Sequence, residues 1–236
     1  MMTLKSWDDL PEQMRTDAVR PYYDVLCAHK MGLAAKRLFD IAVSLLLLAI
    51  LLPVFLVLAI AIKLDSPGPV FFRQIRITQY GGTFRIFKFR TMVQNAEKLG
   101  AQVTVGADPR ITRVGKFIRN CRLDEICQLL NVLTGDMTFV GTRPEVPKYV
   151  DAYTPEMLAT LLLPAGITSE ASILYKDESR LLEQAENVDE IYAQQVLPAK
   201  MRYNLHAIQR FSFWSDIRTM FRTVLAVLGK EYADYL

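Results

Sequence analysis

The apolar positions of the sequence are concentrated in one long run near the N-terminus, and shorter patterns follow it. Residues 41–62 contain no charged side chain, and "LLLLAILLPVFLVLAIAI" (45–62) is wholly apolar. A straight helix over 41–62 rises about 33 Å, just enough to cross a hydrocarbon core of about 30 Å. A soluble helix needs a polar face, which this run lacks, so the pattern predicts a membrane segment.

Pro53 divides this run almost evenly and leaves two membrane arrangements. The run either crosses the bilayer as one kinked helix, or enters as two half-helices that meet at Pro53 and turn back near the bilayer centre. Basic residues flank both ends, Lys30, Lys36 and Arg37 before the run and Lys63, Arg73 and Arg76 after it. The positive-inside rule places both flanks in the cytoplasm, so charge symmetry and Pro53 together favour the re-entrant arrangement.

Shorter patterns after the run predict a small β-hairpin and several helices. β-Rich stretches flank the turn pair Gly81-Gly82 within residues 70–92, which is typical of a hairpin. Its strands are unusually basic, with side chains that either solvate one face or contact anionic lipid headgroups: Arg73, Arg76, Arg85, Lys88 and Arg90. Residues 108–120 and 123–136 predict two helices, the first capped by Thr112 and the second ended by Gly135.

The two ends of the chain predict different structures. Residues 1–35 carry no long amphipathic pattern, and we expect a surface extension there. "FSFWSDIRTMFRTVLAVLG" (211–229) predicts an amphipathic helix whose apolar face suits either a membrane interface or core packing. Between them, "MTFV" (137–140) predicts a short strand, and "LLLPAGITSEAS" (161–172) a loop or strand.

Composition narrows the function classes. The net charge of +3 over 236 residues is only mildly basic, which argues against a dedicated nucleic-acid binder. Cys27, Cys121 and Cys127 form no Cys-x-x-Cys pair, and with only two histidines a structural zinc site is not expected. Neither His29 nor His206 lies in a recognisable catalytic motif.

The candidate chemistry lies in "RNCRLDE" (119–125), where Asp124 and Glu125 adjoin a predicted helix start. Carboxylates at that position are stabilised by the helix dipole and need no function. Their cationic surroundings favour a functional interpretation: Arg110, Arg113, Lys116, Arg119 and the later Arg143. Mg²⁺ binds one or two carboxylates plus substrate phosphates, arginines bind the remaining phosphate oxygens, and a second carboxylate can attack phosphorus.

Four stretches resemble the bacterial sugar transferases, the monotopic phosphoglycosyl transferases that start glycan assembly on a polyprenyl phosphate. They are the segment 36–76, "FKFRTM" (87–92), the block "DPRITRVGKFIRNCRLDEICQLLNVLTGDMTFVGTRPE" (108–145) and "FSFWSDI" (211–217). The resemblance implies transfer of sugar-1-phosphate from a UDP-sugar to undecaprenyl phosphate, with release of UMP. It also implies a two-step reaction through a covalent aspartyl intermediate and a helix broken in the membrane.

The resemblance assigns roles to individual residues. Asp124 matches the nucleophile, Glu125 matches the ligand of Mg²⁺, and Pro53 matches the break of the membrane helix. Four cations match the family's positions around the site and are expected to bind substrate phosphates: Arg119, Arg143, Lys88 and Arg90.

Three departures from the family pattern matter. Leu52 replaces the serine before Pro53, and Thr142 replaces the proline of a Gly-Pro-Arg-Pro loop. "GITSEAS" (166–172) stands where many members have "GITGWAQ", which leaves the donor sugar undetermined.

These observations predict a mainly helical α+β, monotopic membrane protein at the cytoplasmic face of the bacterial inner membrane. Its parts would be an N-terminal extension (1–35), a re-entrant helix (36–63) and a catalytic domain (64–236) with interfacial amphipathic helices. The expected partners are a UDP-sugar, undecaprenyl phosphate and the lipid bilayer, without nucleic acid and with a homodimer as one option. The alternative is a non-catalytic membrane anchor that binds anionic lipid through its basic hairpin.

Overall fold

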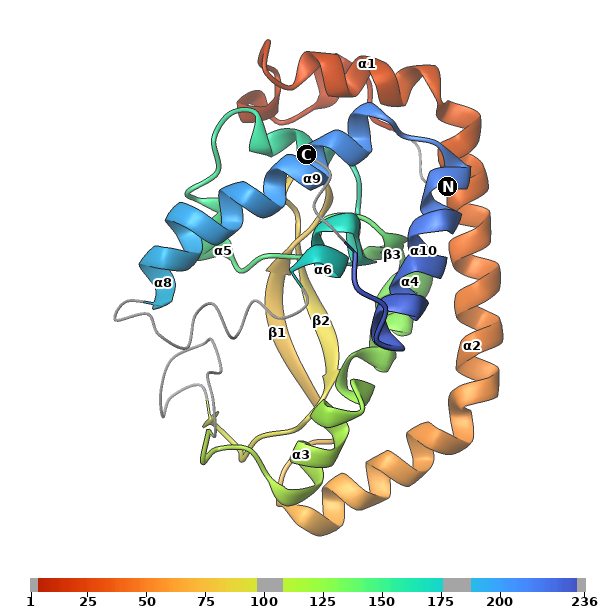
Figure 1. Ribbon diagram of the computed structural model, residues 1–236, viewed down its shortest axis with the longest axis vertical. Coiled ribbons are helices and arrows are strands. Elements are labelled where there is room, and N and C mark those ends of the chain that lie inside the picture. The colour runs from red at the N-terminus through yellow and green to blue at the C-terminus, as the bar shows by residue number, and fades with distance from the viewer. Residues whose placement is uncertain (1–3, 97–107, 176–187, 233–236) are drawn as a thin grey trace.

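A computed structural model describes residues 4–96, 108–175 and 188–232 as a mainly helical α+β fold with two small sheets (Figure 1). The helices are α1 (Arg20–Ala28), α2 (Lys30–Asp65), α3 (Arg113–Asn120), α4 (Leu129–Thr134), α5 (Pro147–Val150), α6 (Glu170–Leu174), α8 (Val188–Ile191), α9 (Leu197–Gln209) and α10 (Phe213–Val227). The strands are β1 (Phe71–Ile77), β2 (Thr83–Phe89), β3 (Met137–Val140) and β4 (Ala165–Thr168). This confirms the predicted fold class at the level of its elements.

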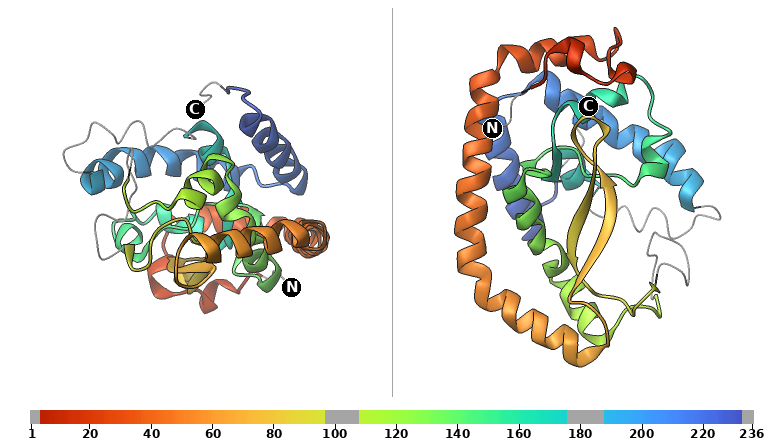
Figure 2. Two further views of the ribbon diagram at one scale, coloured as in Figure 1. Left: turned by 90° about the horizontal axis from the view of Figure 1, so that it is seen from below. Right: turned by 180° about the vertical axis from the view of Figure 1, so that it is seen from behind.

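Helix α2 is the long apolar helix that the sequence predicts. It runs for 36 residues without interruption and contains Pro53. Its axis follows one edge of the body and then bends beneath it, as Figures 1 and 2 both show. Proline lacks the donor for one helical hydrogen bond and clashes with the preceding turn, so Pro53 is the expected cause of the bend. The helix is long and apolar enough to cross a membrane, and re-entry stays a prediction.

Buried polar groups on one side of α2 bind it to β3 and α10. Asp40 is 1% exposed and accepts hydrogen bonds from the Thr138 hydroxyl (2.7 Å) and the Phe139 amide (3.2 Å) of β3. Lys36 donates to the Val140 carbonyl (2.7 Å) and pairs with Asp216 of α10 (2.5 Å). Buried charges are tolerated when they are paired and hydrogen-bonded, so these contacts fix where α2 lies against β3 and α10.

The predicted β-hairpin is confirmed. β1 and β2 are antiparallel, with Phe71 opposite Phe89 and Ile77 opposite Thr83. The turn uses left-handed backbone at Tyr80 (φ 58°) and Gly81 (φ 76°), a conformation that glycine adopts without strain.

The second sheet is a parallel pair, β3 and β4, so "LLLPAGITSEAS" contains a strand as well as loop. Two segments of the backbone come very close just beyond β3: a Cβ added to Gly166 would lie 2.2 Å from the Gly141 backbone nitrogen. Only glycine permits this approach, which sets the path of the loop that follows Gly141.

The N-terminal segment is not the surface extension that we expected. Leu10, Met14, Val19 and Leu26 are buried and pack in one core cluster with residues of α9 and of the segment 157–162. Leu10 directly follows a short 3-10 helix (7–9), and Met14 is the last residue of a second one (12–14). Their apolar positions therefore follow no single helical period, and a search for amphipathic helices misses them.

The region 108–136 is close to its prediction at both ends and different in the middle. Thr112 caps α3 by accepting a hydrogen bond from the Gly115 amide (3.0 Å), and Gly135 ends α4 in the left-handed conformation. Between them, η5 (Leu123–Gln128) is a 3-10 helix rather than the start of an α-helix. Three residues per turn instead of 3.6 rotate the buried face, so Cys127 is buried while Leu123 is half-buried.

Helix α10 is amphipathic as predicted. It begins at a capping box formed by Ser212 and Ser215, and Phe213 packs edge-on against Phe39 of α2. Its other face leaves large apolar side chains exposed: Trp214, Phe221, Val224, Leu225, Val227 and Leu228. Core packing therefore accounts for only one side of the helix.

Candidate active site

The predicted Asp124-Glu125 pair lies in η5, directly after an unusual backbone turn. Arg122, between α3 and η5, adopts a left-handed conformation (φ 53°), which is uncommon for a residue other than glycine. The backbone changes direction at this turn, so η5 does not continue α3, and η5 packs against β2. The two carboxylates therefore sit beside the basic strand that the sequence singled out.

Two cations from distant elements bind Glu125. Lys88 of β2 donates to its Oε1 at 2.7 Å. Arg143, in the loop after β3, donates to Oε1 at 2.5 Å and to Oε2 at 3.2 Å. Burial raises the pKa of Glu125, but the charges and hydrogen bonds of Arg143 and Lys88 outweigh it and hold the pKa well below its usual range. Glu125 is therefore negatively charged at neutral pH, and the positive charges of Lys88 and Arg143 balance it.

Asp124 lies in a different environment although it adjoins Glu125. Within residues 4–96, 108–175 and 188–232, no other side chain forms a hydrogen bond or ion pair with its carboxylate. Burial raises the pKa of Asp124, and the charge of Glu125 raises it further against the opposing effect of Lys88 and Arg119. Adjacent carboxylates with opposite pKa shifts are typical of sites where the two groups have different tasks.

Arg119 of α3 lies close enough to Asp124 for the two charges to interact. Its Nε donates to the Thr91 hydroxyl at 2.9 Å, which orients the guanidinium. Another cation of the same segment, Arg110, is bound by Asp108 through a bidentate contact as short as 2.6 Å. Arg119 is thus the cation of this segment that the structure brings to the carboxylates.

Arg90 is not brought to the carboxylates. It is 5% exposed, and its guanidinium donates to the Ser66 carbonyl (2.6 Å), the Ser66 hydroxyl (2.9 Å) and the Ile62 carbonyl (3.4 Å). These acceptors form the C-terminal end of α2, where orphan carbonyls and the helix dipole favour a cation. These contacts make Arg90 a capping residue of α2, and its expected phosphate-binding role stays a prediction.

A buried network behind Arg143 escaped the sequence analysis. Glu145 is 6% exposed and accepts a hydrogen bond from the Tyr192 hydroxyl at 2.6 Å. Arg76 donates to the Pro144 carbonyl at 3.1 Å, and burial lowers its pKa against the opposing charge of Glu145. Tyr192 lies 47 residues along the chain from Glu145, so only the motif "GTRPE" itself could have drawn attention to the acid.

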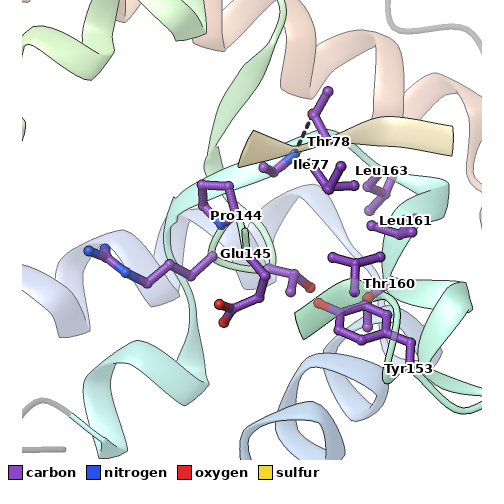
Figure 3. A pocket seen from close by; sticks show the side chains of 12 residues that line it. Ile77, Thr78, Pro144, Glu145, Tyr153, Thr160, Leu161 and Leu163 are labelled. Atoms are coloured by element: carbon purple, nitrogen blue, oxygen red, sulfur yellow. Dashed lines mark hydrogen bonds between the residues drawn. The ribbon is translucent and has the colours of Figure 1, made fainter. Parts of the chain in front are cut away.

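Pro144 and Glu145 also line a small pocket. Figure 3 shows Glu145, Tyr153 and Thr160 around it, with Pro144 at its edge. Its volume is about 10 Å³, room for about one water molecule. It supports the Arg143 loop and cannot hold a substrate.

Comparison with known proteins adds to this geometry. The sequence profile described as "Bacterial sugar transferase" matches residues 31–230. The chain belongs to the bacterial sugar transferase family. The resemblance drawn from the motifs is thereby confirmed.

Three relatives illustrate the similarity. The chain is 36% identical over 201 residues to the UDP-N-acetylgalactosamine-undecaprenyl-phosphate N-acetylgalactosaminephosphotransferase of Aeromonas hydrophila, covering 82% of this chain and 43% of the relative. It is 36% identical over 218 residues to the UDP-glucose:undecaprenyl-phosphate glucose-1-phosphate transferase of Escherichia coli (strain K12), covering 90% and 44%. A putative undecaprenyl-phosphate N-acetylgalactosaminyl 1-phosphate transferase of Bacillus subtilis (strain 168) is 46% identical over 125 residues, covering 53% and 70%. The chain spans less than half the length of the first two relatives.

The described residues of this sugar transferase supply only part of the coordination shell of a hard divalent cation. Within the described part of the chain, no three His, Cys, Asp or Glu side chains are grouped as a metal cage. Mg²⁺ needs no such cage, because it uses one or two carboxylates and completes its shell with water and substrate phosphates. Asp124 offers an open carboxylate, whereas Glu125 already accepts three hydrogen bonds from Lys88 and Arg143.

Proposed function

We propose that this chain transfers sugar-1-phosphate from a UDP-sugar to undecaprenyl phosphate, with release of UMP. The observation that carries the proposal is the pair of unlike carboxylates: Glu125 bound by two cations, and Asp124 open beside them. The names of the relatives from Aeromonas hydrophila and Escherichia coli describe reactions of this kind. The reaction would begin the assembly of a glycan on the lipid carrier.

The reaction proceeds in two displacements at one phosphorus atom. A carboxylate oxygen of Asp124 attacks the phosphorus that carries the sugar, and the bond from that phosphorus to UMP breaks. UMP leaves with the bonding electrons, and the enzyme carries an aspartyl phospho-sugar. A phosphate oxygen of undecaprenyl phosphate then attacks the same phosphorus, the bond to Asp124 breaks, and the carboxylate is restored. Splitting the transfer lets a soluble donor and a lipid acceptor use one site in turn.

The cations have separate tasks in this scheme. Arg119 lies beside Asp124 and is placed to bind donor phosphate oxygens. Lys88 and Arg143 hold Glu125 in place and keep positive charge next to the reacting phosphates. Mg²⁺ held by Glu125 or by the open carboxylate of Asp124, together with the diphosphate, would supply charge neutralisation on the leaving group. We expect EDTA to abolish turnover and Mg²⁺ to restore it.

We further propose that residues 36–63 enter the inner membrane from the cytoplasmic face and return, while 64–236 form the catalytic part. Support comes from the bend of α2, Pro53, and the basic residues on both flanks. Cysteines placed near Lys30 and Asp65 should both resist periplasmic labelling in intact cells. Labelling of either from the periplasm would favour a spanning helix.

The rival function, a non-catalytic anchor whose basic hairpin binds anionic lipid, is weakened by the hairpin's own contacts. Three of its five basic side chains are engaged: Lys88 is bound to Glu125, Arg76 to the Pro144 carbonyl, and Arg90 to the end of α2. Cations already paired inside the protein contribute little to lipid attraction, so the enzyme is the better supported function.

The decisive experiment separates the covalent step from turnover. The protein is mixed with UDP-glucose or UDP-N-acetylgalactosamine alone, and intact mass is read for a sugar-phosphate adduct that maps to Asp124. Asp124→Asn should give no adduct and lose several orders of magnitude in UMP release, as when other nucleophiles are removed. Asp151→Asn, an exposed aspartate outside the site, serves as the matched control. An Asp124→Asn protein with near-normal turnover, or one-step transfer without an adduct, would exclude the mechanism.

A further inference from the structure

A second, much larger cavity shares Thr142, Thr160 and Leu163 with the small pocket beside Glu145. Its volume is about 710 Å³, within the range of about 300–1,000 Å³ usual for ligand pockets. Its walls come from α9 and α10, which both contact α6, and from the loop after β3. In Figure 1, α9 crosses the upper end of the hairpin and α10 lies to the right of it.

The acidic side chains of this cavity are already neutralised. Glu170 pairs with Arg222 at 2.5 Å and accepts a hydrogen bond from Thr219 at 2.7 Å. Asp216 pairs with Lys36 at 2.5 Å. Neither carboxylate therefore leaves negative charge for a cationic ligand.

Two arginines of the cavity are uncommitted. Arg210, the residue directly after α9, and Arg218 of α10 both line it. Across the described ranges 4–96, 108–175 and 188–232, neither guanidinium has a hydrogen-bond or ion-pair partner. Two arginines without acids, in a cavity whose acids are paired, form a site for an anion, and a guanidinium fork matches a phosphate group in particular.

The cavity is connected to the proposed reaction centre through one peptide. Thr142 lines the cavity, and the next residue, Arg143, binds Glu125. Ser169 and Glu170 line it as well. Thr142, Ser169 and Glu170 are also positions where this chain departs from the family's motifs, so the differences that could alter ligand choice converge on one cavity.

We propose that this cavity binds a phosphate-bearing ligand through Arg210 and Arg218, with Ser169 and Glu170 facing the ligand's hydroxyl groups. Two sources can supply that phosphate. One is the nucleotide donor, in which case the inference rests on the proposed function and the cavity is a specificity pocket joined to the reaction centre through Thr142 and Arg143. The other is the headgroup of a membrane lipid, because the outer face of α10 is apolar and exposed.

Four single variants of the full chain test the inference. Arg210→Gln and Arg218→Gln remove one charge each and keep most of the side-chain volume. Ala207→Trp fills the cavity without changing charge, from an exposed position of α9 that lines it. Arg202→Gln is the matched control, because Arg202 is an exposed arginine of the same helix outside the cavity. Each protein is titrated by calorimetry with UDP-glucose and UDP-N-acetylgalactosamine, and separately with short-chain phosphatidylglycerol against short-chain phosphatidylcholine.

Arg210→Gln and Arg218→Gln should each weaken binding of one probe about ten- to a hundredfold, the usual effect of losing a hydrogen bond to a charged group. Ala207→Trp should weaken binding of the same probe, and Arg202→Gln should not. Loss for the nucleotides identifies the donor as the ligand, and loss for phosphatidylglycerol identifies a lipid headgroup. Unchanged affinity for both probes in the two arginine variants overturns the inference, as does normal binding by Ala207→Trp, since charge would then act from outside the cavity.

The outcome is separable from that of the proposed function, because calorimetry needs no turnover. A wild-type protein that releases UMP while the arginine variants bind both probes normally would refute the cavity alone. Arginine-dependent binding without any UMP release would support the cavity and refute the transferase reaction.

Discussion

Replacing Lys36 with methionine should weaken the packing of helix α2 against the rest of the protein. Lys36 and Asp216 are 3% and 16% exposed, and their N–O distance is 2.5 Å. At an effective dielectric constant of about 20 their attraction is about 7 kcal/mol, most of which is offset by the loss of hydration on burial. Lys36→Met removes the attraction but leaves Asp216 buried, and such half-broken pairs cost about 3–5 kcal/mol. The hydrogen bond to the Val140 carbonyl is lost as well.

Thermal unfolding of the protein in nanodiscs measures this cost. A loss of about 3 kcal/mol corresponds to a midpoint lowered by about 6–12 °C for a domain of this size. Lys30→Met, at an exposed position of the same helix, should shift the midpoint far less. The double variant Lys36→Met/Asp216→Leu should recover part of the loss, because no unpaired charge remains. Strictly additive effects of the two substitutions, or an unchanged midpoint for Lys36→Met, would refute the reasoning.

Three further predictions follow from single positions. Gly166→Ala should lower both UMP release and the unfolding midpoint, because its Cβ would lie 2.2 Å from the Gly141 nitrogen; Gly32→Ala, whose nearest contact is an ordinary 3.4 Å to Phe211, is the control that should stay folded and active. Asp124→Asn should stabilise the fold at pH 7, since burial and Glu125 raise the pKa of Asp124 and make its ionisation costly; midpoints measured against pH should show this gain vanish as the pH falls to that of an unfolded aspartate, about 3.9. Pro53→Ala should straighten α2, and periplasmic labelling of a cysteine near Asp65 would then rise above that of the parent protein.

The elements that the sequence revealed are those whose determinants are local. The hairpin turn depends on Gly81 and its flanking strands, and α3 depends on Thr112 as its cap. The buried N-terminal segment was missed because its apolar residues, such as Leu10 and Met14, belong to short 3-10 turns that pack against distant helices. Its burial is a property of the assembled core, which no local pattern records.

The same distinction applies to the candidate site. Asp124 and Glu125 were found because they stand side by side in a motif. That Lys88 and Arg143 both bind Glu125, and that Asp124 is left open, depends on how β2 and the loop after β3 meet. Basic residues spaced two apart on a strand looked equivalent in sequence, yet Lys88 faces Glu125 while Arg90 caps α2.

Both halves of helix α2, the proposed membrane segment, are linked to residues of the proposed reaction centre. Near its start it holds the end of β3 at Val140, three residues before Arg143. At its end it is held by Arg90, two residues after Lys88. Because Arg143 and Lys88 are the two cations that bind Glu125, each of them is tied to α2 within a few residues of chain. The carboxylates are thereby kept at a fixed place relative to the apolar helix, which is the geometric requirement for a reaction between a soluble nucleotide and a phosphate anchored in lipid.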